Sequence, residues 1–226
     1  MSEAGRIEKG RLSAGSGRSF GTVLRRALRS REASLGIVIL MVIIVLSILR
    51  PDAFLSLKNF EAIGNGMVFD LLMAAGLTIV LILWGIDLSV GSVLALTTVT
   101  TALLLRGGVP IPIAVVLGVA TSTACGTLNG FLIARYRIAP FIVTLAMMAM
   151  ARGLATVFTS GYYLSSLPQA FLAIGRGKIA GISISVMLVV VILAVLEILL
   201  RKWRPMHQMY FVGTNPEAAR LSGIRA

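Results

Sequence analysis

The sequence predicts an all-α protein, a polytopic bundle of transmembrane helices with its N-terminus in the cytoplasm. Three observations lead to this fold class. Of the 226 residues, 57% are hydrophobic and only 13% are charged, whereas a soluble domain carries about 25% charged residues. The apolar residues form uninterrupted runs that approach or exceed the roughly 20 residues needed to cross a bilayer. The basic residues gather outside these runs, mainly near the two ends of the chain.

Six apolar segments are predicted to span the membrane, and they define a transmembrane domain over residues 34–200. The spans cover residues 34–49, 64–84, 88–105, 111–134, 139–160 and 179–200. Residues 1–33 are rich in Gly, Ser and Arg without periodicity, which predicts a disordered, basic cytoplasmic tail. Residues 201–226 are predicted to form a cytoplasmic loop that contains one short helix.

The distribution of charge sets the predicted orientation and excludes one class of partner. With the N-terminus inside, the cytoplasmic segments hold 15 basic residues and the outer segments hold five. Basic residues favour the cytoplasmic side of membrane spans, so the net charge of +12 indicates contact with the membrane lipid surface rather than nucleic acid.

No residue pattern predicts catalysis, a metal site or a nucleotide site on this chain. The sequence lacks a phosphate-binding loop of the G-x-x-x-x-G-K-[ST] type and a nucleophile–base pattern. Its single cysteine, Cys125, lies in an apolar run, which excludes an internal disulfide and favours a packing role. His207 has no neighbouring second ligand and is predicted to be a solvated loop residue. Glu197 and Arg201, four residues apart, predict a helical ion pair.

The junction between the second and third spans, Gly85-Ile-Asp-Leu-Ser-Val-Gly-Ser92, is the most unusual segment. An acidic residue beside hydrocarbon is costly and therefore needs a reason. We predict a hinge or gating element formed by Gly85, Asp87, Ser89 and Gly91. The local alternative is that Asp87 caps the third helix through its free N–H groups.

The fourth span carries small residues at every fourth position, and these predict a face for close helix packing. The residues are Ala114, Gly118, Ser122, Gly126 and Gly130. A leucine at Gly126 is expected to disrupt this packing.

Other polar residues within the spans have two possible uses. Asp70 and Arg152 lie at similar depth and are predicted either to form an ion pair in the bundle interior or to reach the interface separately. Further residues can bind a polar solute or bond to their own helix backbones: Thr97, Thr98, Thr100, Thr101, Ser122, Thr123 and Asn129.

The C-terminal segment predicts a short capped helix over residues 216–222. Asn215 suits the N-cap, Pro216 the first turn, Glu217 the positive end of the helix dipole and Gly223 the position after the C-cap. Such a helix is too short to be stable alone. It is therefore either a docking element for a partner or a surface turn.

Three ordered segments together resemble the ribose-type sugar permeases of ABC transporters. Gly85-Ile-Asp-Leu-Ser-Val-Gly-Ser-Val93 is similar to the "GGIDLSVGSV" signature of that family. Pro140-Phe-Ile-Val-Thr-Leu-Ala146 with Ala151-Arg-Gly-Leu154 is similar to its "PFIVTLG…ARGL" segment. Gly213-Thr-Asn-Pro-Glu-Ala-Ala-Arg-Leu-Ser-Gly-Ile224 is similar to its cytoplasmic coupling segment, and the resemblance covers about residue 34 to the end.

The resemblance implies a multi-pass permease subunit of a bacterial inner-membrane importer for a monosaccharide or related polar solute. It implies a second permease copy, identical or different, a periplasmic solute-binding protein and a separate cytoplasmic ATPase that carries ATP and Mg²⁺. The permease chain itself is then not an enzyme and holds no cofactor. The residues implied to couple it to the ATPase are Asn215, Pro216, Glu217, Ala218, Ala219, Ser222 and Gly223.

The sequence also departs from the family that it resembles. Trp84 stands where the signature has its first glycine, and Ala146 stands at a frequent glycine. The family has about ten spans, each of about 20 residues, so the six spans here indicate a fragment, a truncated chain or half of a split permease. An ion-coupled secondary transporter and a non-transporting membrane scaffold remain the alternative functions.

Overall fold

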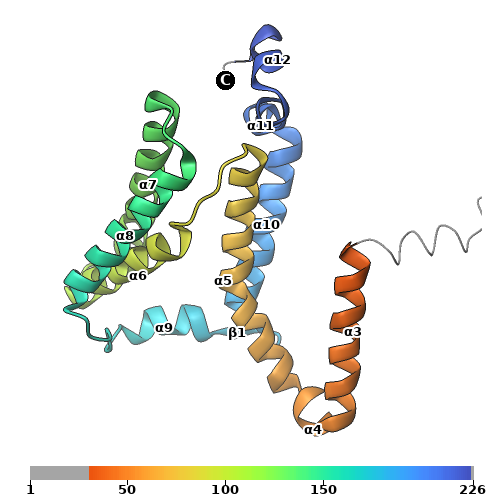
Figure 1. The fold of residues 1–226 in the computed structure, drawn as a ribbon. Helices are drawn as coiled ribbons and strands as arrows, with labels where there is room; N and C mark the ends of the chain where they lie inside the picture. Colours follow the sequence, from red (N-terminus) through yellow and green to blue (C-terminus); the bar gives the residue numbers. More distant parts are fainter. Residues whose placement is uncertain (1–30, 225–226) are drawn as a thin grey trace, which may run out of the picture. The chain divides into compact units, whose positions relative to one another are not determined.

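The computed structural model describes residues 31–224 of the chain, with side chains from Ala33 onward. The chain divides into two compact units, residues 1–60 and residues 61–226, and each is described by itself. Most of the predicted basic tail, residues 1–30, lies outside the described residues. The described part is all-α apart from one short hairpin, and its apolar helices are those of a multi-pass membrane protein (Figure 1).

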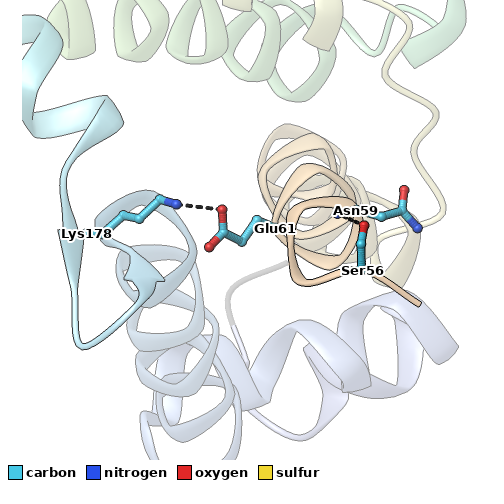
Figure 2. A network of polar contacts seen from close by, with 4 residues as sticks. All are labelled: Ser56, Asn59, Glu61 and Lys178. Atoms are coloured by element: carbon cyan, nitrogen blue, oxygen red, sulfur yellow. Dashed lines mark hydrogen bonds and ion pairs between the residues drawn. The ribbon is translucent and has the colours of Figure 1, made fainter. Parts of the chain in front are cut away.

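The first unit contains α3 (Arg31–Leu49), α4 (Pro51–Phe54) and the first turn of α5 (Leu57–Ile82). Beyond its first turn, helix α3 is apolar on all sides, as expected of a span in contact with lipid. Pro51 is the first residue of α4. An N–H at this position has no acceptor within the helix, so proline costs no hydrogen bond there. Side chains hold the turn into α5: the Asn59 N–H donates to Ser56 Oγ at 3.2 Å (Figure 2). Asn59 Nδ2 also donates to the Phe54 carbonyl at 2.9 Å.

The second unit contains a group of three packed helices, α6 (Val90–Arg106), α7 (Ile111–Tyr136) and α8 (Pro140–Thr159). Helix α6 packs against both of the others (Figure 1). Its Leu96 meets Ala151 and Ala155 of α8 in the core, with Cys125 of α7 at the margin. Small alanine side chains allow the helices to approach closely, which supports association in lipid.

A short connection follows α8 and leads into the last apolar helix. It consists of α9 (Gln169–Arg176) and a hairpin of β1 (Lys178–Ile179) and β2 (Ile182–Ser183), paired in antiparallel register. The two turn residues, Ala180 and Gly181, both have positive φ, as a two-residue hairpin turn of type I′ requires. Helix α10 (Ile184–Lys202) begins directly after β2.

The chain then continues into two helices, α11 (Arg204–Thr214) and α12 (Pro216–Leu221). Helix α11 packs against both α10 and α12. The sequence does not predict α11, because its polar and mixed composition gives no apolar run. His207 therefore lies on a helix and not in a loop, and its ring contacts those of Tyr210 and Phe211; it is exposed, as predicted.

The observed helices agree with the predicted spans except at particular boundaries. Within residues 31–224, α5, α7, α8 and α10 are long and apolar enough to cross a membrane, whereas α6 and residues 33–49 of α3 are shorter apolar helices. The sixth predicted span begins at residue 179, but α10 begins only at residue 184. Residues 179–183 instead form the end of β1, the hairpin turn and β2. The third predicted span also begins two residues before α6.

Two ion pairs join described residues of the second unit. Glu197 and Arg201 form the predicted pair on α10. Glu61 on α5 and Lys178 on β1 form the other, with 2.5 Å between Nζ and Oε2 (Figure 2). This second pair connects segments that are 117 residues apart in the sequence.

Candidate functional site

The loop that joins α5 to α6, residues 83–89, is called the junction loop here. It begins with a helix-ending motif in which the Gly85 N–H donates to the Val80 carbonyl and the Trp84 N–H donates to the Leu81 carbonyl, both at 3.0 Å. This pair of bonds is the Schellman motif, whose left-handed residue is usually glycine. Here that residue is Trp84, with φ of 57° and a side chain 81% exposed.

The two glycines of the predicted hinge serve other purposes. Neither Gly85 nor Gly91 has a positive φ. Gly85 is buried, and a Cβ there would lie 2.9 Å from Val80 Cγ1. Glycine is therefore required at this position because no side chain fits, and not because the backbone must be flexible. Gly91 lies in the first turn of α6, where a Cβ would meet no described atom within 4 Å. The left-handed turn therefore falls on Trp84 and not on a glycine of the motif.

Asp87 orders the start of α6 indirectly. Its Oδ1 accepts hydrogen bonds from the Ser89 N–H at 2.7 Å and from the Ser89 hydroxyl at 2.6 Å. The N-cap of α6 is Ser89, whose hydroxyl is directed to Asp87 and not to the N–H groups of the helix. The prediction that Asp87 caps the helix itself is wrong in this detail: the carboxylate holds the N-cap residue.

The junction loop is held in place by side chains from two other helices. Asn129 Nδ2 on α7 donates to Ser89 Oγ at 3.3 Å. The Thr144 hydroxyl on α8 lies 3.2 Å from the Ile86 carbonyl and 2.9 Å from the Pro140 carbonyl of its own helix. Ser89, Asn129 and Thr144 are all buried. The loop is thus fastened to the group of α6, α7 and α8, and no sequence pattern indicates the role of Thr144.

A cavity of about 300 Å³ lies beside the junction loop, between α5, α6 and α7. Its apolar wall includes Phe69, Leu72 and Met73 of α5. Its polar wall combines Asp87 and Ser89 with residues of the packed helices: Thr97, Ser122 and Asn129. This volume is at the lower end of the range of small-molecule sites, roughly 300–1,000 Å³.

The structure shows which of the polar residues in the spans bond to their own helix and which do not. Most of them donate to a carbonyl of their own helix three or four residues earlier: Thr98, Thr100, Thr101, Ser122 and Thr123. Two differ from these. The Thr97 hydroxyl and Asn129 Oδ1 are buried without a hydrogen-bond partner among the described residues, and both residues line the cavity.

The small-residue face of α7 is buried over only part of its length. Ala114 and Gly118 are buried, and a Cβ on Gly118 would overlap Thr101 Oγ1 of α6. Ser122 is half-buried, whereas Gly126 and Gly130 are exposed, and a Cβ on either would meet no described atom within 4 Å. The expected packing role is therefore restricted to the first half of α7, and a leucine at Gly126 would enter the cavity instead of disrupting a helix contact.

Asp70 and Arg152 are not brought together by the structure. Both side chains are exposed, and neither belongs to an ion pair in the described part of the chain. Their exposed positions agree with the alternative in which each reaches the surface separately. Residues 31–224 also contain no cluster of three or more potential metal ligands.

The C-terminal segment forms the capped helix that its sequence predicts. Asn215 Oδ1 accepts from the N–H groups of Glu217 and Ala218 at 3.1 and 3.0 Å. Gly223, after the C-cap, has φ of 80°. Pro216 begins α12, and Ala219 is its buried residue.

This segment also contacts the end of α5, a contact that the sequence does not reveal. Gly213, the buried residue of α11, lies so close to α5 that a Cβ would overlap the Ile82 carbonyl oxygen and lie 3.6 Å from Leu83 Cα. The neighbouring atoms of Ile82 and Leu83 belong to the backbone, so they cannot make room by a change of rotamer. The segment that leads into the capped helix therefore lies directly against the start of the junction loop.

Comparison with known proteins identifies the family. The family model for the permease component of branched-chain amino acid transport systems matches residues 63–226. The chain belongs to this permease family. The chain is 37% identical over 193 residues to the ribose import permease protein of Bacillus subtilis, and the aligned stretch is 84% of this chain and 59% of that protein. The resemblance to ribose-type ABC permeases is thus confirmed.

Other similar permeases are named for ribose or for another sugar. The ribose import permease protein of Haemophilus influenzae is 32% identical, over 83% of this chain and 59% of that protein. An L-arabinose ABC transporter permease protein of Azospirillum brasilense is 35% identical, over 83% and 55%. The chain therefore spans less than two thirds of these permeases. No solved structure matches it.

The three segments that carry the resemblance to sugar permeases lie at or beside the junction loop. Thr144 of the second motif bonds to the Ile86 carbonyl of the first. Gly213, which begins the third, abuts the last residues of α5 immediately before the first. Segments from three different parts of the sequence thus converge on the junction loop, which borders the cavity.

Proposed function

We propose that this chain is the membrane-spanning subunit of an ATP-driven importer for a monosaccharide or a related small polar solute. A separate cytoplasmic ATPase binds ATP and Mg²⁺, a periplasmic protein delivers the solute to the outer face, and a second permease copy completes the pathway. The location is the bacterial inner membrane. The names of the similar permeases, which mention ribose, arabinose and fructose, support a sugar as the solute.

The observation that carries the proposal is the contact between the C-terminal segment and the end of α5. Helix α12 has six residues and presents Leu221, 88% exposed, in its last turn. A helix this short is not stable alone, so a partner that covers Leu221 would stabilise it. Because Gly213 lies against Ile82, a force applied to α12 has a short path through α11 to the junction loop and the cavity.

The experiment is uptake of radiolabelled D-ribose, L-arabinose and D-fructose by cells that express the chain with an ABC ATPase and a binding protein. Uptake is expected only with an active ATPase, and an ATPase variant unable to hydrolyse ATP is the control. Uptake that is independent of the ATPase but is abolished by a proton uncoupler would favour a secondary transporter. Absence of uptake with all partners present would favour a scaffold.

Docking of α12 is tested within the same system. Leu221→Asp and Glu217→Lys change exposed side chains of α12 and leave the buried Ala219 intact. Both variants are expected to lower uptake at unchanged expression. Glu217→Gln keeps the size of the side chain and is the control for reversal of charge. Normal coupled uptake by Leu221→Asp and Glu217→Lys would contradict the assignment of α12 to the ATPase.

A further inference from the structure

Another cavity, of about 420 Å³, lies where α9 and the hairpin meet α5 and the start of α10. Its wall carries two cations, Arg176 and Lys178, and the hydroxyls of Ser183 and Ser185. No carboxylate is among the described residues that line it. A concave site with cations and hydrogen-bond donors but without an acid favours an anion.

The first residues of α10 add positive potential to this cavity. Ser183 is the N-cap of α10, and its side chain makes no capping hydrogen bond. The first N–H groups of a helix have no acceptor within the helix and carry a partial positive charge, which makes the N-terminus of a long helix attractive to anions. Helix α10 has 19 residues, and its N-terminus lies at the wall of the cavity through Ser183 and Ser185.

The hydroxyl of Ser183 is a polar group that a ligand would satisfy. The residue is only 8% exposed, and its hydroxyl has no hydrogen-bond partner among the described residues. Unlike the hydroxyl of Thr97, it does not belong to the fully enclosed polar atoms and keeps accessible surface. A nearly buried hydroxyl without a partner costs free energy, and a ligand oxygen in the cavity would accept its proton.

The charges around the cavity balance to a single positive charge. Lys178 is paired with Glu61, which lies outside the cavity lining, at 2.5 Å between Nζ and Oε2 (Figure 2). Arg176 belongs to no ion pair in the described part of the chain. Two cations and one carboxylate leave one positive charge, which is matched by the single negative charge of a phosphodiester.

Backbone and side-chain bonds hold the basic end of α9 against the start of α10. The Ile184 N–H donates to the Gly177 carbonyl at 3.0 Å. The Ser185 hydroxyl donates to the Gly175 carbonyl at 3.1 Å. The residues on both sides of Arg176 are thus fixed to α10, so the cavity and its cation are parts of one ordered arrangement.

The cavity lies at the ends of two helices that are long and apolar enough to cross a membrane, α5 and α10. These helices are adjacent there, because a Cβ on Gly64 would lie 3.6 Å from Val186 Cγ2. Val68 and Phe69 of α5 form the apolar wall of the cavity, and Phe69 and Leu188 are exposed to the surroundings of the helices. At the end of a membrane span, apolar surface beside a basic site matches the boundary between acyl chains and headgroups.

We propose that this cavity binds the phosphodiester headgroup of an anionic phospholipid. The phosphate accepts from Ser183 and pairs with Arg176 and Lys178, and the acyl chains lie along the exposed apolar surface of α5 and α10. The apolar wall favours a lipid over a free phosphate ion, which has no apolar part to bury. Lipid binding requires neither a solute nor an ATPase, so the inference is independent of the proposed function.

The test is native mass spectrometry of the full chain in detergent, titrated with phosphatidylglycerol or with phosphatidylcholine of the same acyl chains. One phosphatidylglycerol molecule is expected to bind more tightly than any further copies. Phosphatidylcholine is expected to bind more weakly, because its quaternary ammonium group is repelled by Arg176. Millimolar inorganic phosphate is expected not to displace the bound lipid.

Variants connect this lipid to the cavity. Arg176→Gln should weaken the tight binding about fivefold, the contribution of one basic residue at an anionic membrane surface, and Arg176→Lys should retain most of it. Ser183→Ala should also weaken it about fivefold, through the loss of one hydrogen bond. Arg106→Gln is the matched control, since Arg106 is an exposed cation at the end of α6 that does not line this cavity.

Three results would overturn the proposal. The first is equal affinity of the wild type, Arg176→Gln and Ser183→Ala for phosphatidylglycerol, with unchanged helical circular dichroism. The second is displacement of the lipid by inorganic phosphate, which would identify a free anion as the ligand. The third is lower ATP-dependent uptake by Arg176→Gln at unchanged lipid affinity, which would assign Arg176 to an acidic surface of a partner protein.

Discussion

Two single residues, Gly213 and Trp84, show how backbone geometry restricts the choice of side chain. Gly213 abuts the carbonyl end of α5, and Trp84 occupies the left-handed position of the Schellman motif. The first is a glycine where only a glycine fits. The second is a tryptophan where a glycine is preferred. The backbone of Trp84 is therefore strained at the start of the junction loop.

Gly213→Ala is expected to destabilise the protein. Its Cβ would overlap the Ile82 carbonyl, which is backbone and must shift with its helix, and overpacking of this kind costs about 1–3 kcal/mol. Thermal unfolding in detergent measures the effect. Gly66→Ala on α5, where a Cβ meets no described atom within 4 Å, is the control and should not lower the melting temperature. An unchanged melting temperature for Gly213→Ala would show that α11 does not lie against α5.

Trp84→Gly is expected to stabilise the junction loop. A left-handed conformation costs a residue with a Cβ about 1–2 kcal/mol relative to glycine, and the ring, being 81% exposed, buries little surface that glycine would lose. Trp84→Ala removes the ring and keeps the Cβ, so it separates the two effects. The melting temperature should rise for glycine and not for alanine. A fall for both variants would mean that the ring itself stabilises the protein.

Among the secondary-structure elements, the sequence locates the apolar helices well and the polar ones poorly. The predicted spans correspond to α3, α5, α6, α7, α8 and α10, because long apolar runs identify membrane helices directly. The sequence does not indicate the hairpin before α10 or the helices α9 and α11. Their residues carry no long apolar run, and their formation depends on packing against neighbouring elements.

The short helix α12 is an element whose stability depends on its cap. Asn215→Ala removes the acceptor for two N–H groups and should cost about 1 kcal/mol. Asn215→Asp retains an acceptor oxygen and is the control. Hydrogen–deuterium exchange at residues 217–221 should accelerate in the alanine variant only. Equal acceleration in both variants would show that the amide group, and not an acceptor oxygen, is needed.

For the molecule as a whole, contacts between distant segments decide how the second unit holds together. The junction loop bonds to α7 and α8, its entry from α5 meets α11, and the other end of α5 pairs with β1 through Glu61 and Lys178. Helix α5 therefore has anchors near both ends.

The Glu61–Lys178 pair can be tested by charge reversal. Glu61→Lys and Lys178→Glu should each lower stability, by about 1 kcal/mol at most because the pair is partly exposed. The double variant should recover most of the loss, and high salt should reduce the difference. A double-mutant cycle from thermal unfolding measures the coupling. Additive losses without recovery would contradict a direct interaction.

The membrane class, the positions of the apolar helices, the capped C-terminal helix and the three motifs that identify the family can all be read from the sequence. These features depend on local composition and short spacing, which one chain displays in full. Three other features need the folded chain. The Thr97 hydroxyl and Asn129 Oδ1 are buried without a hydrogen-bond partner among the described residues. Only the first half of the small-residue face of α7 is packed, and segments of all three motifs lie at or beside the junction loop. The physical reason is that hydrogen-bond satisfaction and close approach depend on neighbours from other helices, and no spacing within one helix reveals them.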